Sequence, residues 1–312
     1  MDQFQSDIQP QTARSASTLD EKPAVLAPSV RPIETVSPQA CATCGSAPAT
    51  NGGSTASPSW IYAIGRIEAR FPSVSVEKEF AQATSRADTK GLADRQAMQA
   101  VLSKPENRYL VRQLCFVMTI NGLETYLLVP RDAADISLLV EALRPTPQPW
   151  DLDVVVGMKG PIAPAHMCNG LMVPLVIFDQ IYSFDRDSLI KSIPRPEKSS
   201  AKEFAPAAEE LFDRIMQMTD NAGATDGDRA LNYLAVRYQA IYTGAAEAFA
   251  RNASLSAVEV QPSSLSGTRN LVDVILTYTN RNTDVDEKFS VRVDVTEKFP
   301  FLVRKLSPYY DR

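Results

Sequence analysis

The sequence predicts an α+β protein, because two hydrophobic periodicities follow one another along its 312 residues. Apolar residues recur at helical spacing over 204–218 and 231–249, and they alternate with polar residues over 271–278 and 289–295. Two helices followed by antiparallel strands are typical of a helical layer that covers one face of a sheet. We therefore expect a C-terminal domain over 203–312, with two helices packed on an antiparallel sheet.

A β-hairpin is the clearest local signal in the N-terminal half. Asn121-Gly122 has the sequence of a two-residue type I′ turn, and it separates apolar segments at Tyr109–Ile120 and Leu123–Val129. The expected register pairs the ends of the two strands and faces their apolar residues toward one another. The predicted cross-strand pairs are Ile120 with Leu123, Phe116 with Leu127, and Leu114 with Val129.

The hairpin belongs to an expected first domain of mixed α/β structure over 58–195. Strands are expected where β-branched and aromatic residues dominate, and helices where apolar residues recur every three or four positions. The expected strands are 60–67, 151–157 and 173–182, and the expected helices are 76–84, 92–102, 133–143 and 187–192. A linker is placed at 196–202, because the overlapping segment PRPEKSS at 194–200 has the composition of a domain boundary.

Residues 1–57 are rich in Pro, Ser, Ala, Thr and Gln and have no sustained period. Such a segment buries too little apolar surface to offset the entropy of ordering it, so we expect a disordered arm. The arm carries one chemical motif, a CxxC formed by Cys41 and Cys44.

Net charge and hydropathy argue against binding to nucleic acid and against a location in or beyond a membrane. Lys+Arg 32 against Asp+Glu 37 gives a net charge of −5, so no basic field favours a nucleic-acid backbone. The longest apolar stretch, Leu171–Phe178, is far shorter than the roughly 20 residues that span a bilayer. Neither a membrane-spanning segment nor a secretory signal is expected, and a cytoplasmic protein is predicted.

Four cysteines and a single histidine set the expected site chemistry. In the cytoplasm structural disulfides are not expected, because thiols there are kept reduced. A CxxC loop can offer two thiolates to one tetrahedral ion, and Cys115 and Cys168 are the two further cysteines that would complete a four-thiolate site. We therefore predict a structural zinc ion held by Cys41, Cys44, Cys115 and Cys168, which would attach the arm to the first domain.

Three alternatives to this zinc site stay open. Cys115 and Cys168 could be small buried hydrophobic residues beside an unrelated CxxC, and the CxxC could be a redox pair. His166 could also replace one thiolate, since it lies two residues before Cys168.

No catalytic residue is predicted. The chain has neither a G-x-S-x-G elbow for a catalytic serine nor a P-loop or G-x-G-x-x-G for nucleotides. Asp151 and Asp153 could hold a hard cation, but a solvated strand end is the favoured interpretation. A second acidic group, Glu209, Glu210 and Asp213, is interpreted as the solvent-exposed face of a helix. Arg66, Glu68 and Arg70 alternate along a strand, where they could recognise a peptide or form an exposed strand face.

Several long segments resemble a known family. WIYAIGRIEARFPSVSVEKEFAQAT, NRYLVRQLCFVMTINGLETYLLVPRD and GPIAPAHMCNGLMVP are three of them, and FDQIYSFDRDSLIKSIP and VRVDVTEKFPFLVRKLSPYYDR are two more. Over about residues 58–312 the chain is similar to the C-terminal domain of unknown function of the PatG family of cyanobactin maturation proteases. The subtilisin-like protease domain of that family has no counterpart in this sequence, so its protease and macrocyclisation activities are not implied.

The resemblance implies a non-catalytic accessory protein in the maturation of ribosomally made, cyanobactin-like peptides. Such a protein would bind a precursor peptide or a modifying enzyme of the pathway. Two other hypotheses stay open: a zinc-dependent peptide-modifying enzyme with an open coordination position, and a structural or oligomerisation module. The sequence also leaves open whether the chain forms a homodimer.

Overall fold

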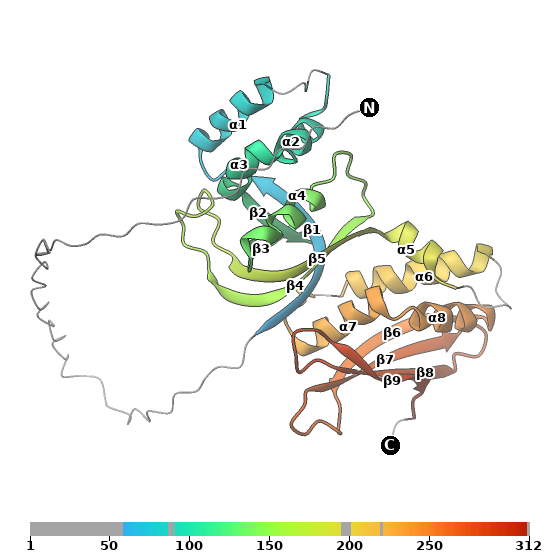
Figure 1. The fold of residues 1–312 in the computed structure, drawn as a ribbon. Helices are drawn as coiled ribbons and strands as arrows, with labels where there is room; N and C mark the ends of the chain where they lie inside the picture. The colour runs from blue at the N-terminus through green and yellow to red at the C-terminus, as the bar shows by residue number, and fades with distance from the viewer. Residues whose placement is uncertain (1–58, 87–88, 90, 195–200, 219–220, 311–312) are drawn as a thin grey trace, which may run out of the picture. The chain divides into compact units, whose positions relative to one another are not determined.

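The computed structural model describes residues 59–86, 89, 91–194, 201–218 and 221–310. These residues form eight α-helices and two β-sheets, which confirms the α+β class (Figure 1). The arm expected over 1–57 lies outside the described residues, and so do residues 196–200 of the expected linker. Among the helices of the described part, none has the length and hydrophobicity needed to cross a bilayer.

The first sheet is a closed five-stranded barrel with the order β1-β2-β3-β5-β4. Its pairs are antiparallel except for β3 with β5, which run parallel. Its strands are β1 (Trp60–Arg70), β2 (Cys115–Ile120), β3 (Leu123–Pro130), β4 (Asp151–Ile162) and β5 (Pro174–Asp185).

Short helices connect the barrel strands and close its interior. The connections are α1 (Val74–Arg86), α2 (Asp94–Leu102), the 3₁₀ turn η1 (Pro105–Asn107), α3 (Arg108–Gln113), the 3₁₀ turn η2 (Ala133–Asp135) and α4 (Ile136–Ala142). Their apolar faces join the inward side chains of the strands in one core, in which Ile67, Phe116 and Phe178 are each at most 3% exposed. This core fixes which strand residues point outward.

The C-terminal part holds four helices and the second sheet. The helices are α5 (Arg186–Ser192), α6 (Ala201–Met216), α7 (Asp226–Arg237) and α8 (Ala240–Ala250). The sheet has the antiparallel order β6-β7-β8-β9, with β6 (Ala253–Pro262), β7 (Leu271–Asn280), β8 (Asp286–Asp294) and β9 (Phe301–Pro308). The predicted inward faces of β7 and β8 are confirmed, because Val274, Leu276, Val291 and Val293 are buried in one core with the helices.

A second core crosses the expected domain boundary, so the two-domain division is not confirmed. Tyr62 and Ile64 point out of the barrel into the same cluster as α6, α7 and β7. The side-chain Nδ2 of Asn232 on α7 donates to the carbonyl of Tyr62 at 2.8 Å and to Asn221 Oδ1 at 3.0 Å. The Tyr62 amide donates to the Gly223 carbonyl at 2.9 Å. Helix α7 therefore packs directly on β1.

The strand predicted from Tyr109 was wrong at its start. Residues 108–113 form α3, because Leu110, Val111 and Leu114 lie at i, i+1 and i+4 and share one helical face that is buried. The predicted pairing of Phe116 with Leu127 was also wrong, since Phe116 lies opposite Leu128.

The hairpin turn itself is confirmed, and a bulge explains the shifted register. Asn121 and Gly122 have φ angles of 50° and 80°, as a type I′ turn requires, and Ile120 pairs with Leu123. An irregularity between Met118 and Thr119 then moves the pairing by one residue.

The long helical stripe over 231–249 is two helices rather than one. Tyr238 leaves the helical conformation at φ −116° and ψ 84°, and its hydroxyl accepts a hydrogen bond from the Leu306 amide at 3.0 Å. Three helices therefore cover the C-terminal sheet where two were predicted. Strands β6 and β9 were not predicted.

Candidate functional site

The outward face of β1 carries a row of alternating charges. Arg66, Glu68 and Arg70 point away from the barrel core, while the intervening Ile67 is buried inside it at 1% exposure. This arrangement follows from the period of two along a strand, and it places the three charged residues on one face.

The neighbouring strands extend this face. The register places Arg66 opposite Thr119 of β2, and Thr119 opposite Glu124 of β3. The same register places Arg70 opposite Cys115. The three strands together form the floor of a cleft of about 480 Å³, a size at which proteins bind small molecules or a few residues of peptide. We call it the charged cleft.

The second wall of the charged cleft comes from distant segments. Phe212, Asp213 and Met216 of α6 line it, together with Trp150 and Arg186, which lie side by side immediately before β4 and immediately after β5. The Arg186 side chain donates to Asp213 at 3.2 Å, and its amide donates to the Trp150 carbonyl at 3.1 Å. Trp150 as a whole residue is 39% exposed, so a large apolar residue is available beside the charges.

The charges in the cleft balance. Three arginines (Arg66, Arg70 and Arg186) are matched by three carboxylates (Glu68, Glu124 and Asp213) among its lining residues. Arg70 forms ion pairs with Glu124 and, at 3.7 Å, with Glu68, whereas Arg66 donates to the Pro149 carbonyl. A surface of this kind favours a ligand with polar groups of both signs over a polyanion.

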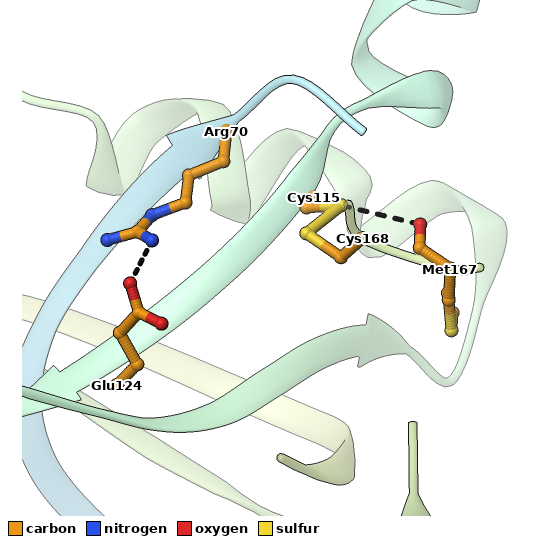
Figure 2. Close-up of a disulfide and its surroundings, with 5 residues drawn as sticks. All are labelled: Arg70, Cys115, Glu124, Met167 and Cys168. Carbon is orange, nitrogen blue, oxygen red and sulfur yellow. Dashed lines mark hydrogen bonds and ion pairs between the residues drawn. A yellow bond between two sulfur atoms is a disulfide. The ribbon is translucent and has the colours of Figure 1, made fainter. Parts of the chain in front are cut away.

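A second cavity of about 300 Å³ continues the charged cleft, because Arg70 and Glu124 line both. Its other wall is the loop between β4 and β5, which contributes Cys168 through Leu171. Figure 2 shows the Arg70–Glu124 ion pair beside the bonded sulfurs of Cys115 and Cys168.

The structure brings Cys115 and Cys168 together across a sequence separation of 53 residues, with Cα atoms 6.0 Å apart. The two sulfurs form a disulfide, so the expectation that no structural disulfide would form was wrong for this pair. Both residues belong to a small hydrophobic cluster separate from the two main cores. Cys41 and Cys44, the other two predicted zinc ligands, lie outside the described residues.

The remaining candidate for the metal site is His166, which is exposed in the same loop as Cys168. Within the described ranges no group of three or more His, Cys, Asp or Glu side chains is close enough to hold a metal ion.

Asp151 and Asp153 do not form a solvated strand end, so that interpretation was wrong. They are 7% and 2% exposed, and the guanidinium of Arg144 lies 3.7 and 3.8 Å from their carboxylates. Asp153 accepts hydrogen bonds from the Ile67 amide at 3.0 Å and from the Ser183 hydroxyl at 2.6 Å. Burial raises the pKa of Asp153 above its usual range, although these hydrogen bonds and Arg144 act in the opposite direction.

The role of this buried carboxylate is structural. Strand β1 pairs with β4 through residue 65 and with β2 from residue 66, so the Ile67 amide no longer faces a β4 backbone partner. Asp153 of β4 accepts from that amide, which allows β1 to change partners without leaving a buried donor unpaired.

Comparison with known proteins supports the resemblance found in the sequence. Residues 198–309 match the family model described as PatG C-terminal. The structure is similar to a solved one described as "PatG Domain of Unknown Function", with a TM-score of 0.64 and 18% identity over 81% of this chain and 99% of that chain. A comparison with curated proteins finds no match. The two similarities confirm the predicted resemblance, and the second shows a shared fold.

Proposed function

We propose that this chain, with its PatG-type C-terminal region, is a non-catalytic accessory protein in the maturation of ribosomally made peptides. It binds a precursor peptide in the charged cleft and so presents that peptide to a modifying enzyme. The observation that carries the proposal is the cleft itself, in which balanced charges lie beside the exposed face of Trp150. A peptide supplies matching chemistry, because it carries side chains of both signs, polar backbone groups and apolar residues.

The balanced charge also separates a peptide from a nucleic acid. A phosphate backbone requires cations that are free to contact it, and Arg70 and Arg186 are each engaged by a carboxylate at the cleft. Four of the five segments that carry the PatG resemblance contribute residues to the cleft or its continuation, which are Arg66, Glu124, Cys168 and Arg186.

Replacing Arg66 by alanine is expected to weaken peptide binding about tenfold or more, because the peptide loses a charged hydrogen-bond donor at the cleft. The probe is a synthetic precursor peptide encoded by a gene neighbouring that of this chain, and isothermal titration calorimetry measures its Kd. Arg304→Ala on β9 is the matched control, since Arg304 is exposed outside the charged cleft.

Equal loss of affinity in both variants would place binding elsewhere. Absence of binding by the wild-type chain would overturn the peptide-binding proposal and favour a structural or oligomerisation role.

We further propose that Cys115 and Cys168, once reduced, join Cys41 and Cys44 in a structural zinc site. The donor set fits, because the two described sulfurs already lie at one place and thiolates are the ligands that structural zinc prefers. Zinc held there would attach the N-terminal arm to strand β2. The site would contribute to folding and not to a reaction, since four protein ligands leave no open position.

The Cys44→Ser variant, purified with a reductant, is expected to lose about one equivalent of zinc and to melt several degrees lower than the wild type. Metal content by mass spectrometry and melting by circular dichroism measure the two effects. Thr43→Ser, between the two cysteines, is the control and should change neither. Unchanged zinc content and Tm in Cys44→Ser would contradict the site, and a shell of fewer than four sulfurs plus water would favour the zinc-enzyme hypothesis.

A further inference from the structure

The loop between β4 and β5 covers part of the face that forms the charged cleft. Val117 of β2 and Leu127 of β3 pair with one another and point outward, yet they are 0% and 2% exposed. Three of the side chains packed against them come from the loop, namely Ala163, Leu171 and Val173, and Leu175 of β5 completes the cluster. We call residues 163–173 the flap.

The flap is a compact unit of its own. Its backbone hydrogen bonds join its own residues: the Ala163 amide donates to Val173, the Gly170 amide to Ala165, and the Leu171 amide to Cys168, at 2.8 to 2.9 Å. Its attachments to β2 include the small apolar cluster, the disulfide from Cys168 to Cys115, and a 3.7 Å contact between Cys115 Sγ and the Met167 carbonyl. A unit built in this way can move away from the barrel without breaking strand pairing.

The disulfide lies at the junction of the flap and the cleft. Cys168 is 3% exposed and lines the cavity that continues the charged cleft past Arg70 and Glu124, so this cavity is the side from which a reductant would approach the disulfide. In the strand register Cys115 lies opposite Arg70 and Val117 lies opposite Glu68. The covered apolar surface is therefore a direct extension of the charged row on β1.

We propose that the flap is a redox-controlled lid, held over Val117 and Leu127 by the Cys115–Cys168 disulfide. This inference rests on the proposed function, since the uncovered surface would take apolar side chains of the peptide bound in the charged cleft. In the opening step a dithiol reductant attacks one sulfur through a thiolate, forms a mixed disulfide, and is released as its own disulfide. Cys115 and Cys168 gain two electrons and two protons and become thiols.

Opening is tested by hydrogen exchange on the full chain, with and without dithiothreitol, in the presence of EDTA so that zinc cannot replace the disulfide. Reduction is expected to speed exchange of the Ala163, Gly170 and Leu171 amides about 30-fold or more, because a cross-link of this kind is lost. Exchange of the β7 amides should stay unchanged. Fluorescence of the apolar dye ANS should rise as Val117 and Leu127 become exposed.

Variants separate the disulfide from other effects of the reductant. Cys168→Ser should exchange in the flap as the reduced wild type does, and the double variant Cys41→Ser/Cys44→Ser should still respond to dithiothreitol. Protection of the flap after complete reduction would overturn the lid, and so would faster exchange throughout β2 and β3. Free thiols at Cys115 and Cys168 in the air-oxidised protein, located by alkylation and peptide mass spectrometry, would overturn it as well.

The peptide titration distinguishes this proposal from the one on which it rests. If the flap opens on reduction but the precursor peptide binds in neither state, the lid stands and the proposed function fails. If the peptide binds equally in both states and the flap stays protected, the proposed function stands and the lid fails. With EDTA present, so that zinc does not hold Cys115 and Cys168 together, both proposals together predict tighter binding of the peptide to the reduced chain.

Discussion

Replacing Asp153 by alanine is expected to lower the free energy of unfolding by about 3–5 kcal/mol. The change leaves the Ile67 amide and the Ser183 hydroxyl without their acceptor in a site that is 2% exposed, and it removes a carboxylate from the Arg144 guanidinium. Each buried donor without a partner costs about 1–3 kcal/mol. Urea unfolding followed by circular dichroism measures the loss.

Asp153→Asn separates the hydrogen bonds from the charge. Its amide oxygen can accept from Ile67 and Ser183, so we expect a smaller loss than in Asp153→Ala. A loss as large in the asparagine variant would show that the ion pair with Arg144, and not the acceptor role, carries the effect.

The difference in unfolding free energy between the wild type and Asp153→Asn is expected to depend on pH. The pKa of Asp153 is higher in the folded protein than in the unfolded chain, because burial disfavours the charged form. Between the two pKa values the folded state binds more protons, so this group contributes stability that is lost as pH rises through the folded pKa. The stability of the wild type relative to Asp153→Asn should therefore increase as pH is lowered into that window from neutrality. A difference that is constant between neutrality and pH 4 would contradict the raised pKa.

Replacing Gly223 by alanine is expected to cost about 3 kcal/mol or more. Gly223 has a φ of +72°, and a Cβ there would lie closer than 3.0 Å to backbone atoms of Tyr62 and Ala63. The segment would have to withdraw from β1, which would break the hydrogen bond from the Tyr62 amide and disturb the contact with Asn232. Thermal unfolding measures the effect.

Gly170 provides the matched control for Gly223. Its φ is +87°, but no atom lies within 4 Å of the position that a Cβ would take. Gly170→Ala should therefore cost only the backbone preference, about 1 kcal/mol. Similar losses at the two sites would show that the close packing of Gly223 on β1 contributes nothing.

Local chemistry made much of the secondary structure predictable. The Asn121-Gly122 turn needed only its own two residues, and β7 and β8 were evident from uninterrupted alternation. Strand β6 was missed because an irregularity between Leu255 and Ala257 breaks its alternation. The change from α7 to α8 at Tyr238 was missed because apolar residues continue on both sides of the break.

Closure of the barrel could not be predicted in the same way. It depends on β1 pairing with both β2 and β4, and on a parallel contact between β3 and β5, which are properties of distant segments. The buried acceptor role of Asp153 follows from that closure. Alternating aspartates on a strand therefore had the same appearance as a solvated strand end.

The candidate site was predictable only where it lies on one strand. The alternation of Arg66, Glu68 and Arg70 predicted one outward charged face of a strand, either a peptide-recognition surface or a plain exposed face. Asp213 was assigned to the solvent-exposed face of a helix, and Trp150 and Arg186 were not identified. The fold alone joins those segments. The four cysteines led to the prediction of a zinc site, and the bonding of Cys115 to Cys168 in a disulfide was not expected.

The place of β1 in the fold has a consequence for synthesis on the ribosome. This first strand pairs with β2 and β4, and α7 covers its outer side through Asn232, so its partners emerge late from the exit tunnel. Until then the nascent chain exposes Tyr62 and Ile64, and such surfaces recruit chaperones or lead to aggregation. A fragment that stops before α7 would leave Tyr62 and Ile64 exposed, so the barrel is best expressed together with the C-terminal part of the chain.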